Sequence, residues 1–206
     1  MLLDIHPDNP DERKIKKVVE CLLDGGVIIY PTDTVYGMGC DIHNAKAFQK
    51  ISQLKNIKPE KANFSIICHD LSHISEYTRH MDNTTYKVMK RALPGPFTFI
   101  LHAGSSLPKH FKNKKKTIGI RIPDHLIPRA IVNELGRPIL TTSVHDDDEI
   151  LDYITDPYDI HEKFKDKVDI VIEGGFGHNQ ASTVVDCTTG TYEVLRQGLG
   201  RLEDIL

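Results

Sequence analysis

The feature that most constrains this chain is a short β-branched run, residues 27–30, that ends at a proline and leads into a polar segment. β-branched residues favour a buried strand, and Pro31 cannot continue a central ladder because it has no amide hydrogen. Three polar residues follow the end of this strand: Thr32, Thr34 and Tyr36. Gly37 and Gly39 remove side chains where another backbone or a ligand approaches closely. The spacing alone leaves two interpretations open, an ordinary loop or a binding loop held by a rigid scaffold.

Length alone allows one large domain or two small ones, and the sequence contains no linker, internal repeat or low-complexity tract that would divide it. The chain has 206 residues, a formal net charge of −3 and no apolar run as long as a membrane span. It turns polar at Asp4, so we expect no secretory signal peptide. The four cysteines are widely spaced without a CxxC pair, which favours free thiols in a reducing compartment. We therefore predict a single domain over residues 1–206, cytoplasmic and without a membrane partner. The oligomeric state is left open.

Basic residues cluster locally although the net charge is slightly negative. The densest run consists of Lys109, Lys112, Lys114, Lys115 and Lys116. Such runs are usually solvated surface, but a run that converges with other cations forms a face suited to phosphates. The eleven histidines supply no clear ligand set, because the adjacent Cys68 and His69 alone are not one. We expect no metal site built by the protein itself.

Helices and strands alternate along the chain. Periodic apolar residues and capping signals predict helices over residues 9–24, 44–54, 71–77, 83–93, 126–135 and 157–165. Strand patterns are found over residues 27–30, 64–68, 98–102, 117–122, 138–143, 168–173, 183–187 and 193–196. Several connections, notably that between residues 186 and 193, are too short for a crossover helix. The predicted fold class is therefore α/β, with a mixed sheet flanked by helices.

Polar residues stand at the ends of several predicted elements, and the chain contains no GxSxG, Walker or GxGxxG motif. They are Thr32, Thr34, Lys55, Lys58, Thr117, Arg121, Thr141, Thr142, Ser143 and Arg196. Thr117 and Arg121 are four apart and share one face of a strand. Structural roles are the alternative: Arg121 in an internal ion pair, and Arg196 paired with Glu193 or Asp186. Together, cations and hydroxyls around a strand-end crevice suit an anionic or zwitterionic ligand.

Five segments, in order along the chain, resemble the signatures of the YrdC/YciO family. Residues 31–40 resemble its PTDTVYGLGC motif, residues 94–101 its PGPxTxIL and residues 117–123 its TVGVRxP. Residues 182–186 are similar to its STVVD, and residues 194–198 to its closing LRxG element. Five ordered matches that span nearly the whole chain make the resemblance highly specific.

The resemblance implies a twisted, open α/β sheet with a positively charged cavity. It also implies the family's activity, in which ATP, bicarbonate and L-threonine give threonylcarbamoyl-AMP and pyrophosphate. That product is the intermediate for the N6-threonylcarbamoyl modification of adenosine in tRNA. The expected partners are therefore ATP or AMP, L-threonine and bicarbonate, with Mg²⁺ bound through the nucleotide phosphates.

Roles carried over residue by residue fall into three groups. The resemblance assigns substrate binding to Thr32, Thr34, Tyr36, Arg121 and Thr141, with Arg121 on the threonine carboxylate. It assigns nucleotide binding to Thr117 and Arg196. It assigns catalysis to Lys55, Lys58, Ser143 and His145.

Departures from the family pattern gather on the side expected to face the ATP phosphates. The arginine of the synthases' KxR element is Ile57 here, with Lys58 next to it, and the strand histidine is Ile67. The asparagine of the SxN element is His145, and the acidic residues 146–149 follow it. Lysine lacks the planar fork of arginine, so this loss is not conservative. The pattern is most similar to the YciO branch of the family.

Two functional hypotheses follow. The first is a YciO-type protein that binds nucleotide and RNA and has weak or altered threonylcarbamoyl-AMP synthase activity. The second is a non-catalytic protein that binds tRNA or double-stranded RNA through the basic run between Lys109 and Lys116. Binding to RNA should weaken steeply with salt, because each phosphate contact releases counterions.

Overall fold

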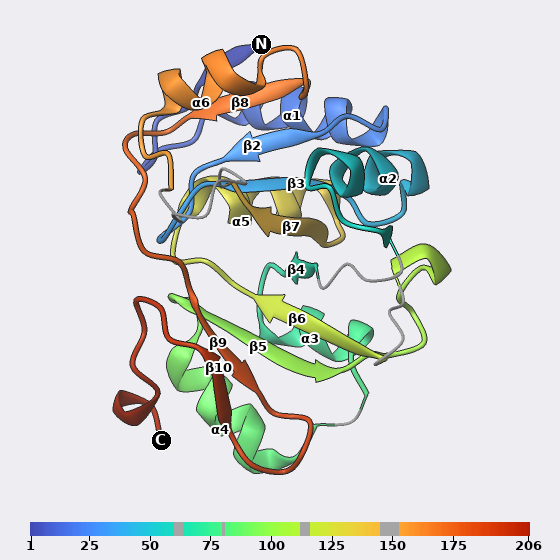
Figure 1. Cartoon of the computed structure of the whole chain (residues 1–206), viewed down its shortest axis with the longest axis vertical. Helices are drawn as coiled ribbons and strands as arrows, with labels where there is room; N and C mark the ends of the chain where they lie inside the picture. Colours follow the sequence, from blue (N-terminus) through green and yellow to red (C-terminus); the bar gives the residue numbers. More distant parts are fainter. Residues whose placement is uncertain (60–63, 80, 112–115, 145–152) are drawn as a thin grey trace.

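Ten strands form one mixed sheet in the computed structural model, which describes residues 1–59, 64–79, 81–111, 116–144 and 153–206 (Figure 1). The strands are β1 (Leu2–Asp4), β2 (Ile28–Tyr30), β3 (Gly37–Asp41), β4 (Ser65–Ile67), β5 (Phe97–His102), β6 (Thr117–Arg121), β7 (Ile139–Ser143), β8 (Ile170–Glu173), β9 (Thr183–Asp186) and β10 (Glu193–Arg196). Their spatial order is β1-β8-β2-β3-β7-β4-β6-β5-β9-β10. β2 is parallel to β8 and antiparallel to β3. The predicted mixed sheet is confirmed.

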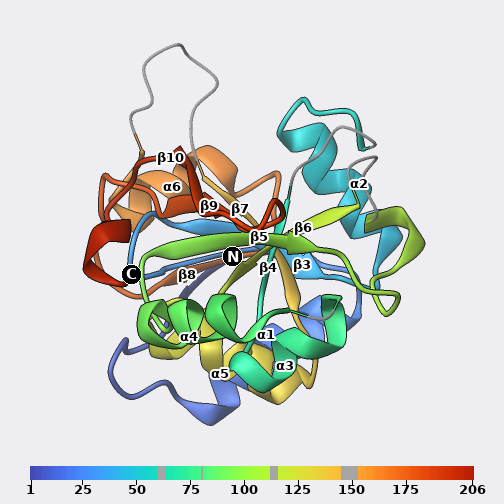
Figure 2. The same cartoon turned by 90° about the horizontal axis from the view of Figure 1, so that it is seen from below.

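Helices cover the sheet on both sides. They are α1 (Glu12–Leu23), α2 (Ala45–Leu54), α3 (Leu71–Tyr77), α4 (Asn83–Ala92), α5 (Leu126–Leu135) and α6 (Pro157–Phe164), with short 3₁₀ turns η2 (Lys109–Phe111) and η3 (Leu202–Asp204). In Figure 2, α1, α3, α4 and α5 lie below the strands, and α2 and α6 lie above them. All six predicted helices are present. Asp11 caps α1 and Asn44 caps α2, each by accepting hydrogen bonds from backbone amides of the first turn.

The strand β3 was not predicted, because its sequence GMGCD contains two glycines. The reason for the glycines is the ring of Tyr30, which lies over them. A Cβ on Gly37 would stand 3.0 Å from that ring, and one on Gly39 would stand 3.1 Å from it and 2.3 Å from the carbonyl oxygen of Leu140. The glycines therefore admit a tyrosine ring and the neighbouring strand β7, and this close approach is internal to the fold.

Two apolar clusters hold the layers together. One packs α1 and α5 against β2, and its fully buried members include Val18, Leu22 and Ile131. The larger cluster joins α2, α3, α4 and α6 to the other strands. Among the described residues no helix is long and apolar enough to cross a membrane. The sheet therefore has a solid support on which polar strand ends can be held in place.

Candidate functional site

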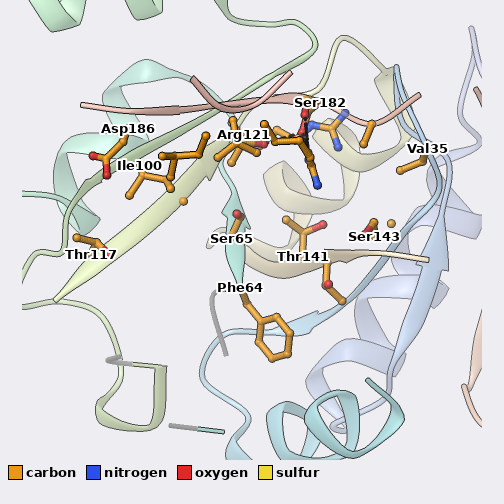
Figure 3. Close-up of a pocket in the computed structure, with 18 of the residues that line it drawn as sticks. Val35, Phe64, Ser65, Ile100, Thr117, Arg121, Thr141, Ser143, Ser182 and Asp186 are labelled. Carbon is orange, nitrogen blue, oxygen red and sulfur yellow. Dashed lines mark hydrogen bonds between the residues drawn. The ribbon is translucent and has the colours of Figure 1, made fainter. Parts of the chain in front are cut away.

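A cavity of about 600 Å³ is lined mainly by residues of the central strands and of β9 and β10 (Figure 3). On β6, Thr117, Gly119 and Arg121 line it and alternate with the buried Ile118 and Ile120. Alternation along a strand puts every second side chain on one face. The prediction that Thr117 and Arg121 share a face is confirmed.

Arg121 is the most constrained cation of the cavity. Its side chain is only 8% exposed, and its Nη2 donates to Thr32 Oγ1 (3.1 Å), Asp33 Oδ1 (2.5 Å) and Thr34 Oγ1 (2.6 Å). Its Nε is buried and has no partner among the described residues. One edge of the guanidinium is therefore fixed by the fold, and a buried donor remains for a ligand.

Thr32 and Thr34 are buried behind Arg121 and bind it. Thr32 also donates to the carbonyl oxygen of Val35 at 2.7 Å, and its Oγ1 accepts the backbone amide of Thr34 at 3.1 Å. The segment that carries Thr32 and Thr34, here called the threonine loop, thus holds the Arg121 guanidinium through the two threonine hydroxyl oxygens. The structure places these two predicted substrate-binding residues in support of Arg121, which itself lines the cavity.

Arg196 brings a second cation to the cavity from β10. Its Nη2 donates to the carbonyl oxygen of Ser182 at 2.9 Å and to Ser182 Oγ at 3.3 Å, and its Nε donates to the same carbonyl at 3.2 Å. Ser182 Oγ in turn lies 2.9 Å from Thr98 Oγ1. Arg196 is exposed as a residue, but partial desolvation of its guanidinium and the nearby Arg121 lower its pKa. Within the described residues Ser182 is its hydrogen-bonding partner, in place of the Glu193 or Asp186 considered from sequence.

Arg121 and Arg196 both line the cavity and bring two guanidinium groups to it. Both point into the same space, and each is held by hydrogen bonds on one edge of its guanidinium. Fixed guanidinium groups bind carboxylate and phosphate oxygens through charge-assisted hydrogen bonds, often in pairs. The far end is different in character, because Asp186 lies there near Thr117 (Figure 3). The Asp186 carboxylate accepts the backbone amide of Thr188 at 2.8 Å.

Lys55 and Ser143 come together where α2 meets β7. Lys55 is buried, and its Nζ donates to the carbonyl oxygen of Ser143 at 3.3 Å. Ser143 lines the cavity, so the ammonium group stands beside the wall. Lys58 is exposed four residues beyond the end of α2, and Ile57 packs against the large apolar cluster. Of the predicted catalytic residues, the structure brings Lys55 and Ser143 together, and His145 lies outside the described residues.

Tyr36 and Thr141 also line the cavity. The Tyr36 hydroxyl donates to the carbonyl oxygen of Gly175 at 2.7 Å, and this ties the threonine loop to the segment after β8. Burial raises the pKa of Tyr36 well above its ordinary value. Thr141 is buried at the base of the cavity.

The predicted RNA-binding run is described only at its two ends. Lys109 and Lys116 are exposed, and Lys116 directly precedes the cavity residue Thr117. Lys112, Lys114 and Lys115 lie outside the described residues. Next to Lys109, His110 Nε2 lies 2.9 Å from the carbonyl oxygen of Ile42. This end of the run is therefore anchored to the fold.

No described residues form a cluster of three or more His, Cys, Asp or Glu side chains that could hold a metal ion. His69 and His73 do stand four residues apart, a spacing that the sequence analysis overlooked. The backbone amide of His69 lies 3.4 Å from His73 Nδ1 and faces that nitrogen. Cys40 and Cys68 are buried free thiols, and Cys21 and Cys187 are free and half-buried.

Sequence reasoning missed several polar cavity residues, among them Ser65, Thr98 and Ser182. Thr98 and Ser182 belong to recognised motifs, but neither was given a role. A glycine points to Ser65, because a Cβ on Gly119 would stand 2.2 Å from Ser65 Oγ. A glycine inside a strand often marks the close approach of a neighbouring group, and Gly119 was therefore the available sequence signal for Ser65.

Comparison with known proteins supports one family. The profile of the family Sua5_yciO_yrdC, described as telomere recombination, matches residues 20–198. The YciO protein of Escherichia coli K12 is 38% identical over 204 residues, which cover 98% of this chain and 97% of that protein. A protein of Haemophilus influenzae is 41% identical over 197 residues, covering 95% and 94% of the two chains.

Solved structures agree with this assignment. The crystal structure of E. coli YciO matches with a TM-score of 0.93 at 37% identity, covering 100% of this chain and 99% of that one. The structure of P. abyssi Sua5 complexed with L-threonine matches with a TM-score of 0.90 at 24% identity. It covers 100% of this chain and 59% of that one, and at this identity the likeness establishes the fold.

Fold and cavity together define an α/β protein with one mixed sheet and a cavity lined by two hydrogen-bonded arginines. The chain belongs to the Sua5/YciO/YrdC family. The resemblance found in the five sequence motifs is confirmed.

Proposed function

We propose that the cavity binds L-threonine and ATP, and that the protein forms threonylcarbamoyl-AMP at a low rate. The observation that carries this proposal is the geometry of Arg121: its buried Nε has no partner among the residues that the structure describes, while Nη2 is fixed by Thr32, Asp33 and Thr34. A carboxylate placed against this edge satisfies the buried donor. The L-threonine bound to the Sua5 structure of the same fold supports this choice of ligand.

The chemistry needs positioning and charge neutralisation more than covalent help. The threonine amine takes up carbon dioxide derived from bicarbonate and becomes a carbamate. A carbamate oxygen then attacks the α-phosphorus of ATP, and the bond to pyrophosphate breaks. Arg121 would hold the carboxylate, while Arg196 and Lys55 would face developing phosphate charge. Mg²⁺ would arrive with the phosphates of ATP.

The low rate follows from the residues that replace the family's pattern. Ile57 stands at the arginine position and packs against the apolar cluster, so it offers no donor to a triphosphate. Removing one fixed donor from developing charge commonly lowers a rate by about 10² to 10³. Lys58 is exposed and supplies a point charge in place of a planar fork.

Restoring the family residues should raise the rate. We expect the double variant Ile57→Arg/His145→Asn to release pyrophosphate from ATP at least about tenfold faster than the unchanged protein, with threonine and bicarbonate present, because it regains a bidentate donor. Ile57→Lys/His145→Asn is the matched control and should gain less. Pyrophosphate release is followed by a coupled assay. Turnover of the unchanged protein at the level of a full synthase would contradict the weak-activity proposal.

We also propose RNA binding as a second function, because the exposed Lys109 and Lys116 bracket a basic segment that ends at the cavity residue Thr117. Cations on that segment could hold RNA phosphates beside the cavity mouth. Such contacts are electrostatic, so affinity would fall linearly with salt on logarithmic axes.

Replacing both described lysines should weaken this binding. We expect Lys109→Ser/Lys116→Ser to bind duplex RNA more weakly and to lower the magnitude of the salt slope by about 1 to 2, roughly one per lost phosphate contact. Fluorescence anisotropy at several salt concentrations measures both quantities. Lys16→Ser/Lys17→Ser on α1 is the matched control, since it changes the net charge equally on another side of the sheet. Identical slopes for both variants would remove this surface from the proposal.

A further inference from the structure

Tyr30 has a buried position that the proposed reaction does not yet use. Its side chain is fully buried in β2, under the cavity wall. Its hydroxyl donates to Thr141 Oγ1 at 2.7 Å. Thr141 lies on β7 and lines the cavity. Tyr30 therefore contacts the site through one intermediate residue.

The direction of this hydrogen bond decides what Thr141 can do. A threonine hydroxyl has one hydrogen, and its oxygen here already accepts the hydrogen of Tyr30. Within the described part of the chain, Tyr30 is the single hydrogen-bonding partner of the Thr141 hydroxyl. The Thr141 hydrogen is therefore left to point elsewhere, and the cavity is the open direction.

Two further observations support Tyr30 as a permanent donor. Burial raises the pKa of Tyr30 far above its ordinary value, although the nearby Arg121 acts in the opposite sense. The phenol therefore keeps its hydrogen at neutral and moderately alkaline pH. Gly37 and Gly39 lie against the Tyr30 ring, and a side chain on either would press on it. Gly37 and Gly39 of β3 therefore leave the room that the Tyr30 ring occupies.

The neighbours of Thr141 indicate the ligand group that it would meet. Thr141 on β7 pairs with Ser65 on the neighbouring strand β4. Ser65 in turn pairs with Gly119 on β6, which lies two residues before Arg121. Figure 3 shows Thr141 and Ser65 on the same cavity wall, with Arg121 above them. A hydroxyl donor beside a fixed guanidinium suits an anionic oxygen.

We infer that Tyr30 is a positioning residue that orients the Thr141 hydroxyl as a donor to an anionic oxygen of the threonine substrate held by Arg121. The inference rests on the proposed function, because it takes L-threonine as the ligand. Tyr30 itself does not touch the substrate. Tyr30 donates its hydrogen to a lone pair of the Thr141 oxygen, and this hydrogen bond disfavours rotation of the Thr141 hydroxyl hydrogen away from the cavity.

The test is a double-mutant cycle read by calorimetric titration with L-threonine and, separately, with AMP. Tyr30→Phe keeps the ring over the glycines and removes only the hydroxyl. We expect it to weaken L-threonine binding about tenfold and to change AMP binding less than twofold. Thr141→Val should weaken L-threonine binding similarly, and Tyr30→Phe added to Thr141→Val should weaken it no further. A general structural defect would weaken both ligands.

Controls separate the possible failures. Thr141→Ser keeps the hydroxyl and should bind L-threonine within about threefold of the unchanged protein, which also tests the role of Thr141 if Tyr30→Phe does not fold. Unchanged threonine affinity in Tyr30→Phe, or additive losses in the double variant, would overturn the inference and leave the proposed function standing. Absence of threonine binding by the unchanged protein would overturn both.

Discussion

Replacing Arg121 by lysine should abolish most of the affinity for L-threonine. We expect the dissociation constant measured by calorimetry to rise at least about 100-fold. Lysine cannot occupy the positions of both Nη2 and Nε, so it cannot keep the contacts to Thr32, Asp33 and Thr34 and also supply the second donor at the Nε position. Asp33 would also lose the partner of its nearly buried carboxylate. Removing one partner of such a pair typically costs about 2 to 5 kcal/mol.

A second ion pair, in which only the carboxylate is buried, supplies the control. Arg137 donates to both carboxylate oxygens of Asp41, and that carboxylate is 4% exposed. Neither residue lines the cavity as the described residues define it. Arg137→Lys should therefore lower the stability of the fold and leave threonine affinity within about threefold. Equal losses of threonine affinity in both variants would show that Arg121 acts through stability alone.

Gly39→Ala should destabilise the fold strongly. Its Cβ would stand 2.3 Å from the carbonyl oxygen of Leu140, which belongs to the backbone of β7, and 3.1 Å from the Tyr30 ring. A backbone atom cannot give way as a flexible side chain can, so the β3–β7 ladder must shift. We expect the free energy of unfolding in urea to fall by about 3 kcal/mol.

Gly37→Ala is the comparison within the same strand. The nearest atoms to its Cβ would be those of the Tyr30 side chain, at 3.0 Å, and no backbone atom is as close, so the expected loss is smaller, about 1 to 2 kcal/mol. The order of the two losses tests the packing of Tyr30 and β7 around β3. A Gly39→Ala protein as stable as the unchanged one would contradict the described β3–β7 pairing.

Local patterns in the sequence were sufficient for most elements of the fold. Helix α5 begins at Leu126 and ends at Leu135 as predicted, because Gly136 closes it in the left-handed conformation. The strand β6 was predicted because its β-branched residues alternate with Thr117 and Arg121. β3 was missed because its glycines are required by close contacts with Tyr30 and Leu140, which lie on the neighbouring strands. A contact between strands that are distant in the sequence leaves no pattern within the segment itself.

For the site, the sequence predicted which residues line the cavity better than it predicted which side chains they contact. Sequence reasoning found Arg121, Arg196 and Thr141 as cavity residues, and all three line the cavity. It could not tell that Thr32 and Thr34 would bind Arg121, since residues 87 to 89 positions apart meet only after the sheet forms. The ion pair weighed for Arg121 is present, with Asp33 as the partner. Arg121 also lines the cavity, and its binding of a ligand stays a prediction.

Phe64 connects the cavity wall to the start of the basic run through a group of packed aromatic rings. Phe64 lines the cavity, and its ring packs edge-on against Phe48 with centroids 5.6 Å apart. Phe48 also contacts His110 and Phe111 of η2. This aromatic group therefore joins the cavity wall to the start of the basic run.

The central claim is that Arg121 receives the carboxylate of L-threonine in this cavity. A crystal structure of the protein with L-threonine and ATP tests it most directly. We predict the threonine carboxylate within hydrogen-bonding distance of the Arg121 guanidinium, on the edge that includes Nε, with the nucleotide phosphates toward Arg196. A structure in which L-threonine binds elsewhere, or in which Arg121 keeps only Thr32, Asp33 and Thr34 as partners beside a bound ligand, would contradict it.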